Sequence, residues 1–237
     1  MNNETRIALV TGAANGIGRA TAIMLAERSH DVVLFDINAS SLAEVENEVR
    51  AYGHRVLSVV CDMGDENSID AALEKVKAFG KIDILVNNAG LWRNDTGDFI
   101  SVSPESMKRR WAVNVFGLMY LTQKLLPDML DRRWGRVINV SSVAGKYGIA
   151  KMVDYSTTKG AVHSFTKALA KETTPYGVLV TSVSPGSVGN AEPTELSYMG
   201  RTSTYKEQAE MICFLAGDGG SYCSGQDFQV DGCRKKM

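Results

Sequence analysis

The sequence lacks the marks of several common classes of protein. Its four cysteines, at positions 61, 213, 223 and 233, have no C-x-x-C spacing, so we expect free thiols in a reducing cytoplasm. The three histidines are scattered without metal-ligand spacing, and we expect no metal site. No apolar run approaches the roughly 20 residues that cross a bilayer. The apolar patch at residues 7–10 is too short for a signal peptide.

The chain also has little net charge. It contains 237 residues, and its 26 basic and 27 acidic side chains give a formal net charge of -1. Nothing in this balance indicates a nucleic-acid surface or an acidic tail. We find no linker, repeat or low-complexity segment. We therefore predict a single domain over residues 1–237, in the cytoplasm, that binds neither nucleic acid nor a membrane.

Short apolar runs alternate with amphipathic segments along the whole chain. We expect strands at 6–11, 31–35, 55–60, 82–86, 136–141, 178–184 and 227–230, and helices at 19–28, 40–52, 67–79, 104–130, 154–174 and 205–216. Strands that alternate with helices indicate an α/β fold with a parallel sheet covered on both faces. Ligands of such sheets bind beyond the carboxyl ends of the strands.

A glycine-rich turn follows the first predicted strand. The motif G-x-x-x-G-x-G starts at Gly12 and leads into a helix, whose free N–H groups and glycine backbone suit a phosphate. An ordinary tight turn is the alternative. Asp36 ends the second strand about 20 residues on, where a carboxylate binds an adenosine ribose and repels a 2′-phosphate. The pattern therefore favours NAD over NADP. A helix N-cap is the alternative role of Asp36, although Ser40 and Ser41 can serve it.

Other polar groups also follow predicted strands. Asp62 follows the third strand, where it can bind an adenine amino group or cap a loop. Asn88 follows the fourth and can satisfy buried backbone groups, while Ala89 and Gly90 leave room for a flat ring. Since the carboxyl ends of parallel strands share one edge, we expect these residues, together with Ser142, to line one rim.

Tyr155 and Lys159 lie four residues apart at the start of a predicted helix, so their side chains share one face. A neighbouring ammonium favours the phenolate, and we expect it to lower the pKa of the tyrosine toward neutrality. The hydroxyl of Ser142 would hold the oxygen that receives the proton. A surface tyrosine and lysine at helical spacing are the alternative. Asn114 is a polar residue in mid-helix, and Gly117 nearby indicates a kink or close packing.

Taken together, these motifs resemble the short-chain dehydrogenase/reductase family along essentially the whole chain. The residues that carry the resemblance are Thr11-Gly12-x-x-x-Gly16-x-Gly18, Asn87-Asn88-Ala89-Gly90, Asn114, Ser142, Tyr155-x-x-x-Lys159 and Pro185-Gly186. The resemblance implies a single-domain, Rossmann-type, doubly wound parallel sheet of about seven strands. It also implies a homotetramer or homodimer built through the helices expected at 104–130 and 154–174.

The resemblance further implies a role for each matching residue. Tyr155 would be the general acid/base, Lys159 would lower its pKa and hold the nicotinamide ribose, Ser142 would bind the substrate oxygen, and Asn114 would hold a water. The expected cofactor-binding residues are Gly12, Asn15, Gly16, Ile17, Gly18, Asp36, Ile37, Asp62, Met63, Asn88, Ala89, Gly90, Tyr155, Lys159, Pro185, Gly186 and Val188.

The sequence departs from the family pattern near the substrate side. Asn190 stands where the family commonly has a threonine, and Cys233 replaces the second glycine of an Asp-Gly-Gly motif. The substrate loop expected at about 187–203 is roughly ten residues short, which suggests an open, disordered or weakened site. Candidate pocket residues, each equally suited to packing, are Trp92, Tyr147, Met152, Tyr198 and Met199.

We therefore expect an NAD(H)-dependent oxidoreductase that interconverts a secondary alcohol and a ketone by hydride transfer. One alternative is an NADP(H)-dependent enzyme like the 3-oxoacyl-[acyl-carrier-protein] reductases. Another, supported by the short loop and Asn190, is an NAD(H)-binding protein with little or no catalysis. A serine hydrolase is disfavoured because the chain has no G-x-S-x-G motif.

Overall fold

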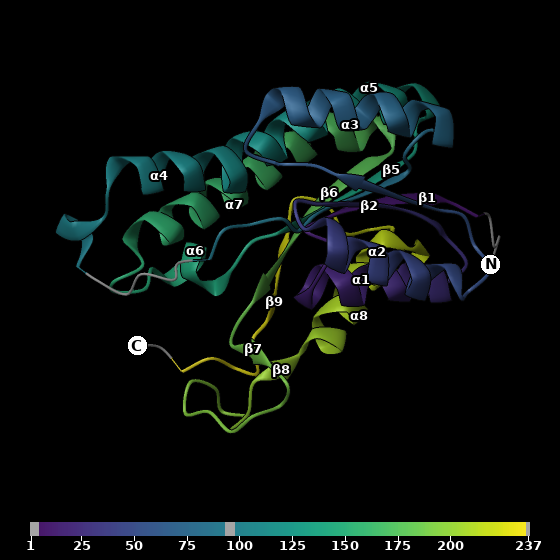
Figure 1. The fold of residues 1–237 in the computed structure, drawn as a ribbon. Helices are drawn as coiled ribbons and strands as arrows, with labels where there is room; N and C mark the ends of the chain where they lie inside the picture. Colours follow the sequence, from purple (N-terminus) through teal and green to yellow (C-terminus); the bar gives the residue numbers. More distant parts are fainter. Residues whose placement is uncertain (1–4, 93–97, 236–237) are drawn as a thin grey trace.

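The computed structural model describes residues 5–92 and 98–235. Within them, seven parallel strands form one sheet in the order β3-β2-β1-β4-β5-β6-β9 (Figure 1). The strands are β1 (Ile7–Thr11), β2 (Asp31–Asp36), β3 (Val56–Val60), β4 (Ile84–Asn87), β5 (Gly135–Val140), β6 (Val178–Pro185) and β9 (Asp227–Val230). The predicted α/β fold with a Rossmann-type sheet is confirmed.

Helices cover both faces of the sheet. One layer contains α1 (Gly16–Glu27), α2 (Ala39–Arg50) and α8 (Tyr205–Ala216), and the other contains α3 (Glu66–Phe79), α4 (Pro104–Trp111), α5 (Leu118–Arg132) and α7 (Val153–Thr173) (Figure 1). A short helix that was not predicted from the sequence, α6 (Val143–Tyr147), follows β5 directly. In the part of the chain that the structure describes, no helix is long and apolar enough to span a membrane.

The central strands are buried on both faces, as the continuous apolar runs predict. In β2, Val32 and Leu34 pack into the core beneath α1, α2 and α8. Val33 and Phe35 point the other way, into the core beneath α3, α5 and α7. Since successive side chains of a strand alternate between faces, one apolar run supplies both cores.

The predicted helix at 104–130 is interrupted. α4 and α5 are joined by a π-helical turn, η2 (Ala112–Gly117), in which Asn114 lies. A Cβ placed on Gly117 would lie 1.8 Å from the carbonyl oxygen of Met63, so glycine allows the helix to approach the β3–α3 loop. The close packing expected at Gly117 is confirmed. The π-helical turn is one of the irregularities that such helices adopt near functional sites.

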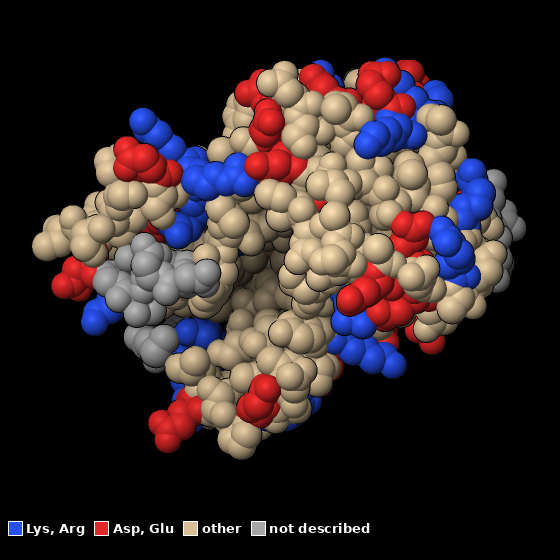
Figure 2. Space-filling model, viewed as in Figure 1, with Lys and Arg blue, Asp and Glu red and all other residues tan. Residues whose placement is uncertain are grey.

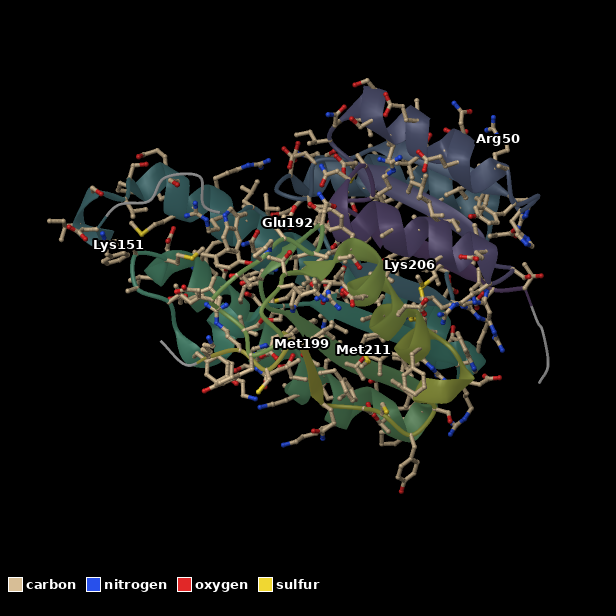
Figure 3. All side chains as sticks on the ribbon, turned by 90° about the horizontal axis from the view of Figure 1, so that it is seen from below. Arg50, Lys151, Glu192, Met199, Lys206 and Met211 are labelled. Atoms are coloured by element: carbon tan, nitrogen blue, oxygen red, sulfur yellow. The ribbon has the colours of Figure 1, made fainter. Side chains whose placement is uncertain are left out.

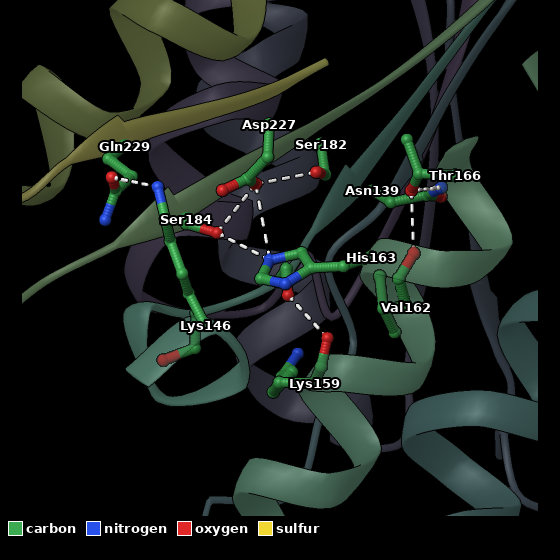
Figure 4. Close-up of polar contacts among 12 residues, drawn as sticks. Asn139, Lys146, Lys159, Val162, His163, Thr166, Ser182, Ser184, Asp227 and Gln229 are labelled. Carbon is green, nitrogen blue, oxygen red and sulfur yellow. Dashed lines mark hydrogen bonds and ion pairs between the residues drawn. The ribbon is translucent and has the colours of Figure 1, made fainter. Parts of the chain in front are cut away.

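A partly buried polar cluster fastens the edge strand β9 to β6 and α7 (Figure 4). Asp227 accepts hydrogen bonds from Ser182 Oγ at 2.6 Å and from Ser184 Oγ at 2.7 Å. His163 Nε2 lies 2.9 Å from Ser184 Oγ and 3.4 Å from Asp227. Burial raises the pKa of Asp227, but these hydrogen bonds outweigh it and hold the pKa below its usual range.

The expected substrate loop is short but internally hydrogen-bonded. Its ends pair as two short parallel strands, β7 (Val188–Gly189) and β8 (Ser203–Thr204). Thr202 N donates to Glu192 O at 2.8 Å, and Thr194 N donates to Gly200 O at 3.0 Å. Glu192 and Met199 both belong to this loop, while Met211 belongs to α8 (Figure 3). The loop is therefore held together by its own backbone hydrogen bonds.

Candidate active site

A cavity of about 1010 Å³ opens at the carboxyl ends of the strands. It lies where the strand order reverses between β1 and β4, the position at which such sheets bind ligands. Figure 2 shows the hollow on this face of the molecule, with mostly uncharged atoms around it. Of the predicted site residues, all line this cavity except Gly18 and Asn114, which lie behind its wall.

The glycine turn is held by the end of β4. Asn88 Nδ2 donates to the backbone oxygens of Thr11 at 2.9 Å and Gly12 at 3.0 Å. Thr11 Oγ1 in turn accepts from the backbone N–H groups of Asn88 and Ala89, both at 3.0 Å. A Cβ on Gly18 would lie 2.0 Å from Gly12 O. Gly18 thus lets α1 pack against the turn, whereas Gly12 and Gly16 face the cavity.

The glycine turn and Asp36 suit a dinucleotide. Among the described residues, the side chain of the N-cap Asn15 makes no capping hydrogen bond to α1. The first backbone N–H groups of the helix are therefore free to bind a phosphate. Asp36 accepts from Ala14 N and Asn38 N, both at 2.9 Å, which fixes its carboxylate beside the turn. The N-cap of α2 is Asn38, not the serines considered from sequence. The residues present therefore fit NAD or NADP.

Arg109, which the sequence analysis missed, reaches the same end of the cavity from α4. It binds both oxygens of Asp62, at 2.7 and 2.9 Å. Partial burial raises the pKa of Asp62, but hydrogen bonds from Arg109 and Gly64 N outweigh this effect and lower it. Asp62 is thus ionised and already paired with Arg109. Its predicted contact with adenine therefore remains a proposal. The pairing was not visible in sequence because 47 positions separate the two residues.

Tyr155 and Ser142 meet at the other end of the cavity, both only 6% exposed. Burial raises the pKa of Tyr155 to about 12, and a hydrogen bond with Ser142 opposes this rise. The expected net fall of the Tyr155 pKa toward neutrality is therefore wrong for this structure. The sequence contains the spacing of the two side chains but not the burial of the phenol, which is the larger effect.

Lys159 is buried beside Tyr155. Its Nζ donates to Val140 O at 2.8 Å and lies 5.8 Å from the centre of the Tyr155 ring. Burial lowers the pKa of this lysine to about 8, so the ammonium form still predominates at neutral pH. The backbone at Lys159 is fixed by Ser141, whose hydroxyl donates to Lys159 O at 2.9 Å. The helix face expected for the pair is confirmed.

Asn114 joins three elements around these groups. Its Oδ1 accepts a hydrogen bond from Leu91 N at 2.7 Å, and its Nδ2 donates one to Thr158 Oγ1 at 3.2 Å. A Cβ on Gly90 would lie 3.3 Å from Lys159 Nζ and 3.5 Å from Asn114 Oδ1. Asn114 therefore positions the β4 loop against α7. Its predicted water-holding role stays a prediction.

Only some of the pocket residues predicted from the sequence line the cavity. Trp92 and Met152 line the cavity, and the Trp92 ring contacts Tyr155 edge-on with centroids 5.1 Å apart. Tyr147 instead hydrogen-bonds Gln229, while Tyr198 and Met199 lie outside the lining. Asn190 does not line the cavity either. Residues that sequence reasoning missed include Ile149, Leu196, Tyr205 and Arg234, which reach the cavity only through the tertiary fold.

Comparisons with known proteins agree with this architecture. The family model for short chain dehydrogenases matches residues 6–197. The 3-oxoacyl-[acyl-carrier-protein] reductase FabG of Thermotoga maritima is 34% identical over 98% of this chain and 98% of the relative. A solved NAD+-bound xylitol dehydrogenase superimposes with a TM-score of 0.90, at 28% identity, over 98% of this chain and all of the other. A blue fluorescent protein from a metagenomic library, solved with NADPH, also gives 0.90 at 28% identity, over 98% of each chain.

The parallel sheet and the glycine turn, together with Ser142, Tyr155 and Lys159 in one cavity, thus define a Rossmann-type oxidoreductase. The chain belongs to the short-chain dehydrogenase family and acts on CH–OH or keto groups with NAD or NADP. The resemblance noted in the sequence is confirmed.

Proposed function

We propose that this protein is an NAD(H)-dependent oxidoreductase that interconverts a secondary alcohol and a ketone. The observation that carries the proposal is the meeting of Ser142, Tyr155 and Lys159 in the same cavity as the glycine turn. A bound nicotinamide would supply the hydride donor or acceptor. The glycine turn, Asp36, Lys159 and the backbone near Val188 would hold the cofactor.

The protein's own residues then position the substrate oxygen and move its proton. Ser142 and Tyr155 share a hydrogen bond, so an oxygen seated between them contacts both hydroxyls. Because the pKa of Tyr155 is about 12, the phenol is protonated at neutral pH and donates its proton to a ketone oxygen during reduction. In the oxidative direction, the Lys159 ammonium offsets the charge that develops on the phenolate. Trp92 packs against the ring of Tyr155 in a T-shaped contact.

Replacing Tyr155 tests the proposal directly. Tyr155→Phe keeps the ring and removes the proton donor, so turnover of alcohols and ketones should fall by about 100-fold or more. NADH affinity, measured by fluorescence, should stay within about twofold, because the glycine turn is untouched. Tyr147→Phe is the matched control, since Tyr147 lies outside the cavity lining and its hydroxyl bonds only Gln229 among the described residues. Equal turnover by both variants would contradict the assignment of Tyr155.

The preference for NAD rests on the surroundings of Asp36. A 2′-phosphate would meet this carboxylate, and the guanidinium of Arg109 is already bound by Asp62. Asp36→Ala should therefore raise kcat/KM with NADPH relative to NADH by about 10-fold or more. An unchanged ratio, measured by absorbance with both cofactors, would show that Asp36 does not select between them.

The alternative is an NADP(H)-dependent reductase of 3-oxoacyl-[acyl-carrier-protein] substrates. It is supported by the 34% identity to the Thermotoga maritima reductase. A protein that binds NAD(H) without catalysis is the less favoured class, because Ser142, Tyr155 and Lys159 are all present in one cavity. The short loop and Asn190 remain its support. Activity with 3-oxoacyl thioesters and NADPH that exceeds activity with NADH would favour the first alternative.

The expected homotetramer or homodimer is also a proposal. Along α4, η2 and α5 the structure exposes Trp111, Phe116 and Met119 by 41%, 50% and 42%, and at the start of α7 it exposes Val153 by 43%. Apolar side chains of this size gathered on neighbouring helices favour burial against another copy. Sedimentation equilibrium tests this, and a monomeric mass would contradict it.

A further inference from the structure

The C-terminal tail brings a cation to the cavity. Residues 231–235 follow the edge strand β9 and run beside the loop between β7 and β8 (Figure 1). Lys235 N donates to Leu196 O at 2.9 Å, and Tyr198 N donates to Cys233 O at 3.0 Å. Arg234, between these two bonds, lines the cavity together with Tyr155, Ser142 and Leu196. The tail and the short loop therefore form one wall of the site.

The backbone of the tail is fixed in an uncommon conformation. Gly232 and Cys233 both have left-handed dihedrals, with φ of +62° and +58°. A side chain at such an angle costs about 1–2 kcal/mol, and the glycine usual in the family at position 233 would avoid that cost. Asp231 Oδ1 accepts from Cys233 N at 3.0 Å, which supports the turn. This turn directs the chain so that Arg234 reaches the cavity.

The guanidinium of Arg234 is available to a ligand. Among residues 5–92 and 98–235 it has no hydrogen-bond, ion-pair or aromatic partner. Of the acidic residues in the adjacent loop and α8, Glu192 accepts from Asn190 N and Thr202 Oγ1, Glu207 binds Arg201 and Glu210 binds Arg28. Glu195 is exposed and lies outside the cavity lining. A cation at the wall of a largely uncharged cavity attracts an anion more strongly than one in open water.

The cation lies at the substrate end rather than the adenosine end. The acidic residues that line the cavity, Asp36 and Asp62, follow β2 and β3. Arg234 follows β9, which is at the opposite edge of the sheet. Between them lie the glycine turn after β1 and the Ser142–Tyr155 pair after β5. The charge of Arg234 therefore faces the substrate side of the reacting groups.

We propose that Arg234 binds a carboxylate on the substrate, so that this enzyme acts on a hydroxy acid or oxo acid rather than on a neutral alcohol or ketone. The guanidinium presents paired N–H donors that match the two oxygens of a carboxylate. This inference rests on the proposed function, since it concerns the substrate of the same site. Arg234 is then a specificity-determining residue.

Steady-state kinetics with matched substrates test the proposal. A panel of hydroxy acids and their methyl esters, assayed with NAD+ by nicotinamide absorbance, should show the acids preferred. Arg234→Gln should lower kcat/KM for the best acid by about 100-fold, mainly through KM, and should change the ester by less than about twofold. Arg234→Lys keeps the charge without the paired donors and should recover part of the loss. Lys235→Gln is the control, because it removes the same charge from the neighbouring residue outside the cavity lining.

A binding measurement separates this inference from the proposed function. With NAD+ at saturation, the same acids should raise the Tm of the wild type and of Lys235→Gln, but not that of Arg234→Gln. Equal use of acids and esters, equal loss of both in Arg234→Gln, or a weakened NADH affinity in that variant would overturn the inference while leaving the oxidoreductase intact. Conversely, acids that bind through Arg234 without any turnover would support the inference and contradict the proposed function.

Discussion

Lys159 should make the folded protein less stable at neutral pH than an apolar residue would. Its side chain is 5% exposed, and burial lowers its pKa to about 8 from an ordinary value of 10.5. Each step of one in pKa corresponds to about 1.4 kcal/mol, so holding the ammonium in the folded chain at pH 7 costs about 3 kcal/mol. Lys159→Met removes this cost but leaves Val140 O without its donor, which costs about 1–3 kcal/mol.

The pH dependence gives the sharper test. Because the folded pKa is depressed, the unfolded chain binds more protons between about pH 8 and pH 10.5, so the stability of the wild type rises across this window. Lys159→Met lacks that rise. We expect the variant to be about 1 kcal/mol more stable than the wild type at pH 7. Its advantage should shrink by about 2–3 kcal/mol by pH 10 and so change sign.

Urea unfolding at several pH values measures both quantities. Lys167→Met is the matched control, since Lys167 lies exposed on the same helix and its replacement should leave the pH dependence unchanged. A stability difference between wild type and Lys159→Met that stays constant from pH 7 to pH 10 would refute the burial argument. Loss of turnover in the more stable variant would show that the lysine is kept for function at the expense of stability.

Two further substitutions test how the site is supported. Gly117→Ala would place a methyl group 1.8 Å from Met63 O. It should therefore lower the free energy of unfolding in urea by about 1–3 kcal/mol and weaken NADH binding. A loss of stability below about 0.5 kcal/mol would contradict the close packing. Glu207→Ala removes the capping box with Thr204 at the start of α8 and should cost about 1 kcal/mol at pH 7. Hydrogen bonds from Arg201 and Thr204 N lower the pKa of Glu207 to about 2. The difference should therefore shrink as the pH falls from about 4.5 through about 2, and an unchanged difference at pH 2 would contradict the assignment.

The local features of the site were predictable from the sequence. The glycine turn, Asp36 and the Tyr155–Lys159 pair each depend on short spacings beside a strand or within one helix turn. Strand periodicity then placed them at one edge of a parallel sheet. The bounds of β9 and, to within one residue, of α7 follow from the same patterns. These predictions succeeded because neighbours in sequence remain neighbours in the fold.

Tertiary structure decided what depends on burial and on distant contacts. The pKa of Tyr155 rises instead of falling because the fold removes the phenol from water, and no local spacing encodes that exclusion. Arg109 pairs with Asp62 across 47 positions. Arg234 reaches the cavity only because β9 ends the sheet beside β6 and the tail pairs with the loop at Leu196. The sequence by itself determined the fold and the local spacing of the candidate site residues, whereas the packing of separate elements decided their electrostatics and brought Arg234 to the cavity wall.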